Sequence, residues 1–163
     1  MNGDLRLYLL FDKLQIKFKY IEHPPAPTIE IAMKYWKNHE AQHCKNIFFR
    51  NHKGDKHYLV ILNCNQILNI RSLELLLKQG KLTFASDERL CKYLGLKPGS
   101  VSPFGLINDK DKHVSLFIDE TLKNADYISF HPNENTASLI ISFSDFEKFL
   151  NYCGNQVNYI QLY

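Results

Sequence analysis

The chain has 163 residues, of which 45% are hydrophobic and 23% are charged. This length and balance predict one folded domain over residues 1–163 and argue against an intrinsically disordered chain. The 20 basic and 17 acidic residues leave a formal charge of +3, which permits a polyanionic partner but does not require one. No apolar run approaches the roughly 18 residues that cross a bilayer. We therefore expect neither a membrane span nor a secretory signal.

The four cysteines are far apart and form no C-x-x-C pair. They are Cys44, Cys64, Cys91 and Cys153. Zinc sites and disulfide frameworks normally show closer, patterned spacing, so we expect no metal and no other cofactor. The same usage is typical of a protein in the reducing cytoplasm, where isolated cysteines pack as small hydrophobes.

The first third of the chain predicts a helix, a strand and a second helix. Apolar residues recur at helical spacing over residues 4–14, and residues 17–22 alternate strictly as in a half-buried strand. The prolines of His23–Pro27 lack amide donors, so the strand must end before them. Thr28 then caps a helix that we expect to continue to about Asn38.

The rest of the chain mixes further strands and helices. We expect strands over residues 43–50, 57–62, 82–84, 105–107, 114–118, 127–130, 137–142 and 157–162. We expect helices over residues 73–78, closed by Gly80, over 86–95, between Ser86 and Gly95, and over 144–152, opened by a Ser144–Glu147 capping box. Hairpin-length links outnumber crossovers. The predicted class is α+β, a curved mixed β-sheet with helices packed around it.

The pair Lys45-Asn46 precedes a hydrophobic strand segment and is the first candidate site. Neighbouring residues of a regular strand point to opposite faces, so both can face one cavity only at a strand start or a bulge. A lysine beside such a strand is commonly solvated. Its functional interpretation is a cation that holds a phosphate or donates to a carbonyl or ribose hydroxyl.

Two further loops carry polar or conformationally special residues. Residues 97–105 contain two prolines and two glycines, and such a stiff loop can direct backbone amides at an oxyanion or a carboxyl group. Residues 130–138 place His131 in a polar loop between two apolar strands, where Asn135, Thr136 and Ser138 could bind a small ligand. Each loop also has an ordinary interpretation, as a connection or as a solvated histidine.

No other pattern specifies a reaction. The sequence has no G-x-S-x-G elbow, H-E-x-x-H motif or Walker loop. Cys44 follows His43, but sequence neighbours seldom have the geometry of a thiol–imidazole pair. Basic residues between Lys37 and His57 can contact phosphates or form a solvated face. Residue chemistry alone therefore predicts an α+β domain in which three stretches are candidates for a functional site.

These three stretches, in this order and spacing, resemble the YbaK/ProX aminoacyl-tRNA editing superfamily. The likeness covers essentially the whole chain, from His23–Thr28 and Lys45-Asn46 through Gly99-Ser100-Val101-Ser102-Pro103 to Phe130-His131-Pro132 with Asn135-Thr136. The Lys-Asn pair and the His-Pro-x-x-Asn-Thr segment look most like the ProXp-ala (PrdX) branch. The resemblance implies a cytoplasmic, monomeric deacylase that removes alanine from mischarged tRNA(Pro), with prolyl-tRNA synthetase as a further candidate partner.

The resemblance also implies roles for individual residues. Lys45 would position the terminal adenosine and assist catalysis, with Asn46 in support. The backbone of Gly99, with the neighbouring Ser100, Val101, Ser102 and Pro103, would hold the aminoacyl carbonyl or the attacking water. His131 would shape the aminoacyl pocket. The substrate-binding set implied by the motifs also includes Thr28, Asn135 and Thr136.

The absence of a nucleophile motif suggests how the ester is cleaved. An aminoacyl ester is already activated, so a positioned water and a stabilised oxyanion can suffice, and the ribose 2′-hydroxyl of the tRNA can relay the proton. Selectivity would follow from a pocket that admits alanine and excludes the larger proline. The alternatives are a deacylase for Cys-tRNA(Pro), a hydrolase for another small aminoacyl ester such as serine, and a catalytically silent module that binds tRNA or a synthetase.

Overall fold

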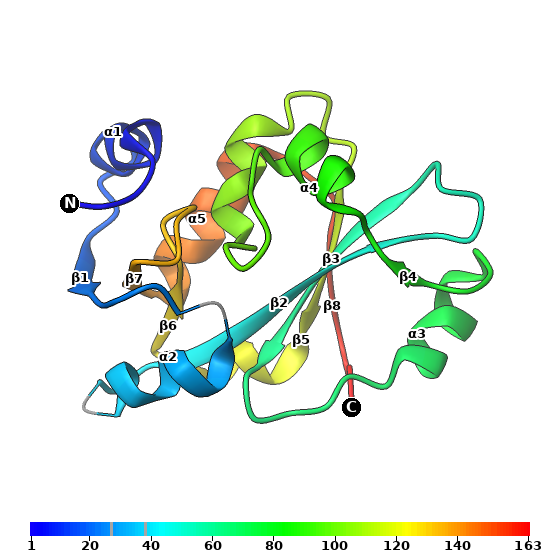
Figure 1. Cartoon of the computed structure of the whole chain (residues 1–163), viewed down its shortest axis with the longest axis horizontal. Coiled ribbons are helices and arrows are strands. Elements are labelled where there is room, and N and C mark those ends of the chain that lie inside the picture. Colours follow the sequence, from blue (N-terminus) through cyan, green and yellow to red (C-terminus); the bar gives the residue numbers. More distant parts are fainter. Residues whose placement is uncertain (27, 38) are drawn as a thin grey trace.

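A computed structural model describes residues 1–26, 28–37 and 39–163. Its strands form one mixed, eight-stranded sheet in the described residues (Figure 1). The order across the sheet is β1 (Phe18–Glu22), β7 (Ala137–Ser142), β6 (Tyr127–Phe130), β2 (Gln42–Arg50), β3 (His57–Asn63), β5 (Ser115–Asp119) and β8 (Val157–Ile160), with the short β4 (Thr83–Phe84) paired to β2.

The sheet combines hairpins with three parallel pairings. Strand β2 pairs with β6, β3 with β5, and β5 with β8 in parallel, and the other pairs are antiparallel. Strand β2 runs diagonally through the molecule and joins the β1–β7–β6 part to the β3–β5–β8 part (Figure 1). The α+β class with a mixed sheet is confirmed. Parallel connections are more numerous than the sequence indicated.

Helices cover the sheet on both sides (Figure 1). They are α1 (Leu5–Lys13), α2 (Ile29–Trp36), α3 (Ile70–Leu77), α4 (Asp87–Leu94) and α5 (Phe143–Cys153), with short 3₁₀ helices η1 (Pro103–Asn108) and η2 (Glu120–Asn124). The largest hydrophobic core lies between one sheet face and α1, α4, α5 and η1. A second core lies on the other face, beneath α3. A small third cluster gathers Ala26, Ala32 and Trp36 at α2.

Two predicted helix caps are confirmed. The Ser86 hydroxyl accepts a hydrogen bond from the Arg89 amide at 3.3 Å, and α4 ends at Gly95. The Thr28 hydroxyl accepts from the Ile31 amide at 3.4 Å and opens α2. Such caps satisfy amides that the first helical turn leaves without a partner. The predicted helix end at Asn38, and Pro27 in the preceding segment, lie outside the described residues.

The predicted strand over residues 105–107 is wrong, because this segment belongs to η1. The Ser102 hydroxyl accepts from the Phe104 amide at 3.2 Å, and Pro103 has a φ angle suited to a first helical position. The 3₁₀ turn buries both Phe104 and Leu106 in the main core. A Cβ on Gly105 would lie 2.8 Å from the Leu94 carbonyl oxygen, so only glycine allows this close approach to the end of α4.

Two predicted helix starts are also wrong. Helix α5 begins two residues earlier than the Ser144–Glu147 pattern indicated, because Ser142 accepts from the Asp145 amide at 3.1 Å and so caps it. Helix α3 begins at Ile70 rather than residue 73, because Asn69 accepts from the Ser72 amide at 3.1 Å. It ends at Leu77, with Lys78 as its C-cap, before Gly80. The earlier start of α5 places Phe143 in the main core, whereas the residues added to α3, Ile70 to Ser72, are exposed.

Candidate active site

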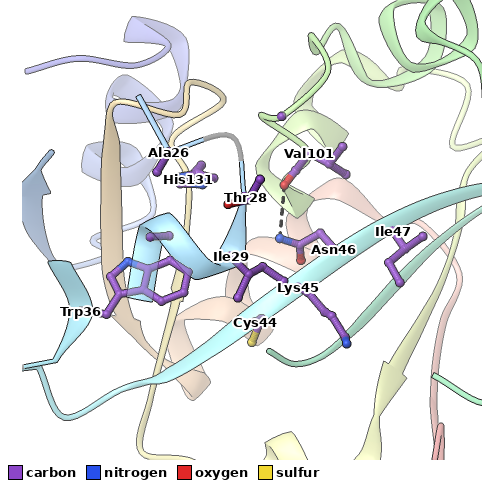
Figure 2. Close-up of a pocket in the computed structure, with 12 residues that line it drawn as sticks. Ala26, Thr28, Ile29, Trp36, Cys44, Lys45, Asn46, Ile47, Val101 and His131 are labelled. Carbon is purple, nitrogen blue, oxygen red and sulfur yellow. Dashed lines mark hydrogen bonds between the residues drawn. The ribbon is translucent and has the colours of Figure 1, made fainter. Parts of the chain in front are cut away.

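A cavity of about 380 Å³ lies between α2, strand β2 and the loop that precedes η1 (Figure 2). Its walls are mainly apolar, with a few polar groups among them. The lining residues are Ala26, Thr28, Ile29, Ala32, Trp36, Cys44, Lys45, Asn46, Ile47, Gly99, Val101 and His131. An apolar cavity with a few convergent polar groups is the usual form of a small-molecule site. The fold therefore gathers Thr28, Lys45, Asn46, Gly99, Val101 and His131 of the sequence-derived site around one cavity.

Lys45 and Asn46 line this cavity from a regular strand. The register between β2 and β3 runs unbroken from Cys44 opposite Asn63 to Arg50 opposite His57, so neither a bulge nor a strand start relaxes the alternation. Figure 2 accordingly shows the Asn46 amide directed toward Val101 and the Lys45 ammonium directed away from it. The half-buried Lys45 thus borders the cavity, while its ammonium group is directed away from Asn46 and Val101 (Figure 2).

The Asn46 side chain ties β2 to the loop before η1. Its Nδ2 donates to the Val101 carbonyl oxygen at 3.2 Å, and this assignment is required because a carbonyl can only accept. The Asn46 Oδ1 atom is buried and accepts no hydrogen bond from the described residues. A buried acceptor without a donor is unfavourable. A ligand that brings a donor into the cavity would remove that cost.

The loop before η1 owes its shape to Pro98 and Gly99. The Ser100 amide donates to the Lys97 carbonyl at 3.1 Å, which closes a four-residue turn. Proline suits the second position of a type II turn, and glycine suits the third, where φ must be positive. Gly99 has a φ of +81°. The turn brings Gly99 and Val101 to the cavity, whereas Ser100 is buried behind it.

Ser102 and Pro103 have structural positions in the same loop. Ser102 is fully buried and caps η1, and Pro103 is the first residue of η1. Neither lines the cavity. We expected ligand contacts along all of Gly99–Pro103, and in the structure Gly99 and Val101 are the residues of this loop that line the cavity.

His131 reaches the cavity from the end of β6. Its Nδ1 lies 2.7 Å from the Ala137 carbonyl oxygen, so Nδ1 carries the proton and donates. Burial lowers the pKa of His131, against the opposing effect of this hydrogen bond. The ring is therefore neutral near pH 7, and its Nε2 lone pair can accept a hydrogen bond from a ligand or a water.

Asn135, Thr136 and Ser138 of the 130–138 loop make hydrogen bonds within the protein and do not line the cavity. The Asn135 carbonyl accepts from the Ala26 amide at 3.1 Å, and the Thr136 carbonyl accepts from the His23 amide at 3.0 Å. Ser138 is 0% exposed and bonds to His23 and Trp36. The suggested ligand contact of Ser138 is therefore wrong, because its hydroxyl is buried and occupied.

Several cavity residues carried no signal in the sequence. Ala26, Ile29, Ala32 and Trp36 come from α2 and the segment before it, and they form the apolar wall opposite β2 (Figure 2). Their helical spacing indicates only a packed face. Cys44 also lines the cavity, but burial raises the pKa of its thiol far above the ordinary range. A protonated thiol is a poor nucleophile.

Within the described residues, no group of three or more His, Cys, Asp or Glu side chains is placed so that it could hold a metal ion. In the same residues, no helix has the length and apolarity to cross a membrane.

Comparison with known proteins identifies the family. A family model described as "Aminoacyl-tRNA editing domain" matches residues 23–149. The prolyl-tRNA editing protein ProX of Acetoanaerobium sticklandii is 38% identical over 162 residues, which is 99% of each chain. The chain belongs to the aminoacyl-tRNA editing family. It is an aminoacyl-tRNA hydrolase of the YbaK/ProX superfamily.

Other relatives and solved structures are similar to this protein over nearly its whole length. Prolyl-tRNA synthetase associated domain-containing protein 1 of Xenopus laevis is 31% identical and covers 95% of both chains. A solved structure assigned as a trans-editing enzyme for prolyl tRNA synthetase superposes with a TM-score of 0.68 at 20% identity, over 98% of this chain and 99% of that one. A hypothetical protein of known structure gives a TM-score of 0.73 at 17% identity, over 96% and 98%. These structures support the fold.

Proposed function

We propose that this enzyme acts in trans on tRNA(Pro) that carries alanine, and hydrolyses the alanyl ester. The observation that carries the proposal is the buried, unpartnered Asn46 Oδ1 in a small apolar cavity beside Lys45. Alanine esterified to a tRNA presents one methyl group, one ammonium group and one ester carbonyl. The cavity offers an apolar wall, buried acceptors and nearby donors, which suits all three. The relative named for prolyl-tRNA editing and the likeness to the ProXp-ala branch favour tRNA(Pro).

The alanyl ammonium group is assigned to the acceptors of the cavity. Asn46 Oδ1 accepts from no donor in the described part of the chain, and His131 Nε2 carries a lone pair because Nδ1 donates to Ala137. Hydrogen bonds to a charged donor are roughly twice as strong as neutral ones. This pair would orient the α-carbon and turn its methyl group toward the Ala26, Ala32 and Ile29 wall.

The tRNA end is assigned to Lys45 and the loop. The Lys45 ammonium would hold a phosphate or ribose hydroxyl of the terminal adenosine. The amides of Gly99 and Val101 donate to no group among the described residues, so they are suited to hold the ester carbonyl as negative charge develops on it. Backbone donors placed in advance are effective because they need no reorganisation during the reaction.

The proposed reaction needs no protein nucleophile. Water adds to the ester carbonyl carbon, the bond from that carbon to the ribose 3′ oxygen breaks, and alanine and free tRNA result. The neighbouring 2′-hydroxyl passes the proton from the water to the leaving 3′ oxygen. Tight placement of water and ester supplies the acceleration.

Size would set the choice between alanine and proline. A cavity of about 380 Å³ shared by an aminoacyl group and part of a ribose leaves little room for a pyrrolidine ring. Exclusion by steric clash is also easier than rejection of a smaller group. Cysteine is only slightly larger than alanine, so removal of cysteine from tRNA(Pro) is the second candidate. A partnership with prolyl-tRNA synthetase belongs to the same proposal, since it would deliver the mischarged product.

A deacylation panel tests the proposal. Ala-, Cys- and Ser-tRNA(Pro) are incubated separately with wild type and with Lys45→Ala, and remaining aminoacyl-tRNA is followed with time. We expect wild type to hydrolyse the alanyl ester fastest and Lys45→Ala to lose that activity. Faster hydrolysis of the cysteinyl ester would reassign the substrate. A terminal 2′-deoxyadenosine should nearly abolish turnover, and full activity without the 2′-hydroxyl would exclude the proton relay.

A further inference from the structure

A buried chain of hydrogen bonds runs from the wall of the cavity into the sheet. The Trp36 Nε1 atom donates to the Ser138 hydroxyl at 3.1 Å, and the same hydroxyl lies 3.0 Å from His23 Nε2. His23 Nδ1 in turn lies 2.9 Å from the Pro24 carbonyl. Trp36 closes α2, His23 follows β1 and Ser138 lies within β7. Three separate elements therefore meet behind one side of the site.

The atom types fix the direction of two bonds in this hydrogen-bond chain. An indole nitrogen can only donate and a carbonyl can only accept, so Trp36 donates to Ser138 and His23 Nδ1 donates to Pro24. With the Nδ1 proton engaged in this way, Nε2 of the His23 ring can accept a hydrogen bond from the Ser138 hydroxyl. Ser138 thus accepts from one partner and donates to the other. In this arrangement the Trp36 N–H, the His23 Nδ1–H and the Ser138 hydroxyl each have an acceptor among the described residues.

A second contact holds the indole from the side of β2. The Trp36 and His43 rings lie 4.2 Å apart at an interplanar angle of 2°. Burial lowers the pKa of His43 to about 4, so the ring stacks in its neutral form near pH 7. The indole is 7% exposed and belongs to the small cluster with Ala26 and Ala32. Its position is set by the helix backbone, by the Ser138 bond and by this stack.

We propose that Ser138 and His23 are positioning residues that hold the Trp36 indole as a wall of the aminoacyl cavity, and so set which amino acid the cavity admits. The part of this inference that concerns amino-acid selectivity rests on the proposed editing function. Trp36 and Ile29 line the cavity from α2, opposite the β2 residues (Figure 2). An indole without the Ser138 partner can rotate to seek water, which changes the space available to a side chain. Neither Ser138 nor His23 lines the cavity.

The sequence provides a direct reporter, because Trp36 is the single tryptophan of the chain. Its fluorescence therefore reports one site in the free protein, without any tRNA. The variant is Ser138→Ala. The matched control is Ser129→Ala, since Ser129 is a buried serine of neighbouring β6 whose hydroxyl has no partner among the described residues. We expect Ser138→Ala to shift the emission and increase the fast loss of anisotropy, and Ser129→Ala to change neither.

Selectivity is the second readout. We expect Ser138→Ala to lower the ratio of kcat/KM for Ala-tRNA(Pro) to that for Pro-tRNA(Pro) by about 10-fold, the scale of one misfitted methylene. Ser129→Ala should keep the wild-type ratio. Trp36→Phe retains an aromatic ring but lacks the N–H, so it should lower the ratio similarly. The double variant Ser138→Ala/Trp36→Phe should be no worse than either single variant, as expected for two groups acting through one bond.

The outcomes separate this inference from the proposed function. Unchanged fluorescence and an unchanged selectivity ratio in Ser138→Ala would overturn the positioning role. Full discrimination by Trp36→Phe would overturn it even if Ser138→Ala does not fold. A wild type inactive on every aminoacyl-tRNA would remove the proposed function instead, and the fluorescence of Ser138→Ala against Ser129→Ala would still decide whether Ser138 holds the indole.

Discussion

Asn46 and Val101 are joined by a hydrogen bond of 3.2 Å between residues 55 positions apart. This contact connects the central strand β2 to the loop that carries Gly99, and it leaves the Oδ1 atom of Asn46 buried beside the cavity without a partner among the described residues. One side chain thus has two separable tasks. It stabilises the site, and it is proposed to bind the alanyl ammonium group.

Asn46→Ala should affect both tasks. We expect kcat/KM for Ala-tRNA(Pro) to fall about 10- to 100-fold, and the free energy of unfolding to fall by about 1 kcal/mol, the usual net value of one hydrogen bond. Asn158→Ala is the matched control, because its Nδ2 donates to the Leu116 carbonyl at 3.1 Å away from the cavity. It should lose similar stability in urea titrations and keep its activity. Equal activity losses in both variants would mean that Asn46 acts through stability alone.

Lys45→Met should remove the charge and keep the apolar stem that borders the cavity. We expect kcat/KM to fall about 100-fold, which corresponds to roughly 2.7 kcal/mol of transition-state stabilisation. The dependence of log KM on log salt should also become shallower by about 0.7, the contribution of one phosphate contact on a single strand. Lys53→Met is the control, because Lys53 is exposed and lies 3.7 Å from Asp55. An unchanged salt slope in Lys45→Met would contradict a phosphate contact.

Much of the fold follows from local patterns, as α4 illustrates. Ser86 and Gly95 mark its two ends, and the capping and terminating preferences of these residues act over a few positions. The segment 105–107 shows the limit. Its apolar residues fit a strand, but burial of Phe104 and Leu106 against α4 favours a 3₁₀ turn. That preference depends on a partner that no local pattern reveals.

The candidate site, like the fold, was predictable from the sequence only in part. Lys45, Asn46 and His131 were found through their register with a known family, since each residue alone has an ordinary interpretation. The wall formed by Trp36 could not be found, because its bond to Ser138 spans 102 residues. Nor could the sequence show that Asn135 and Thr136 use backbone carbonyls to hold the 23–26 segment. Backbone contacts of this kind leave no residue-type signature.

Cys44→Ala should retain hydrolysis of Ala-tRNA(Pro) within about 3-fold of wild type, because burial keeps the thiol protonated and therefore unreactive. Alkylation with iodoacetamide at pH 8, followed by mass spectrometry, should label exposed Cys91 first and buried Cys44 last. Rapid labelling of Cys44 together with loss of turnover in Cys44→Ala would instead support a thiol nucleophile.

Stability should fall in mild acid because of buried His57. This residue is 1% exposed, and burial with neighbouring positive charge lowers its pKa from 6.5 to about 4. The unfolded chain binds a proton below pH 6.5 while the folded chain does not, so unfolding becomes easier as pH falls. The stability contribution is complete above pH 6.5 and is lost as the pH falls toward 4, by up to roughly 3 kcal/mol at 1.36 kcal/mol per unit.

Urea unfolding at pH 7 and pH 4.5 measures this loss. His57→Gln should make the difference between the two pH values smaller. His52→Gln removes an exposed histidine and should leave the difference as in wild type. An identical pH difference in wild type and His57→Gln would show that His57 is not the group responsible.

The central claim is that the cavity around Asn46 and Lys45 admits an alanyl ester and excludes a prolyl ester on the same tRNA. Single-turnover hydrolysis of Ala-tRNA(Pro) and Pro-tRNA(Pro), with wild-type protein in excess, tests it most directly. We expect the alanyl ester to disappear at least about 100-fold faster, within the range that a steric sieve supplies, and the prolyl ester to decay at its rate without protein. Equal rates for the two esters, or no acceleration of either, would contradict the account.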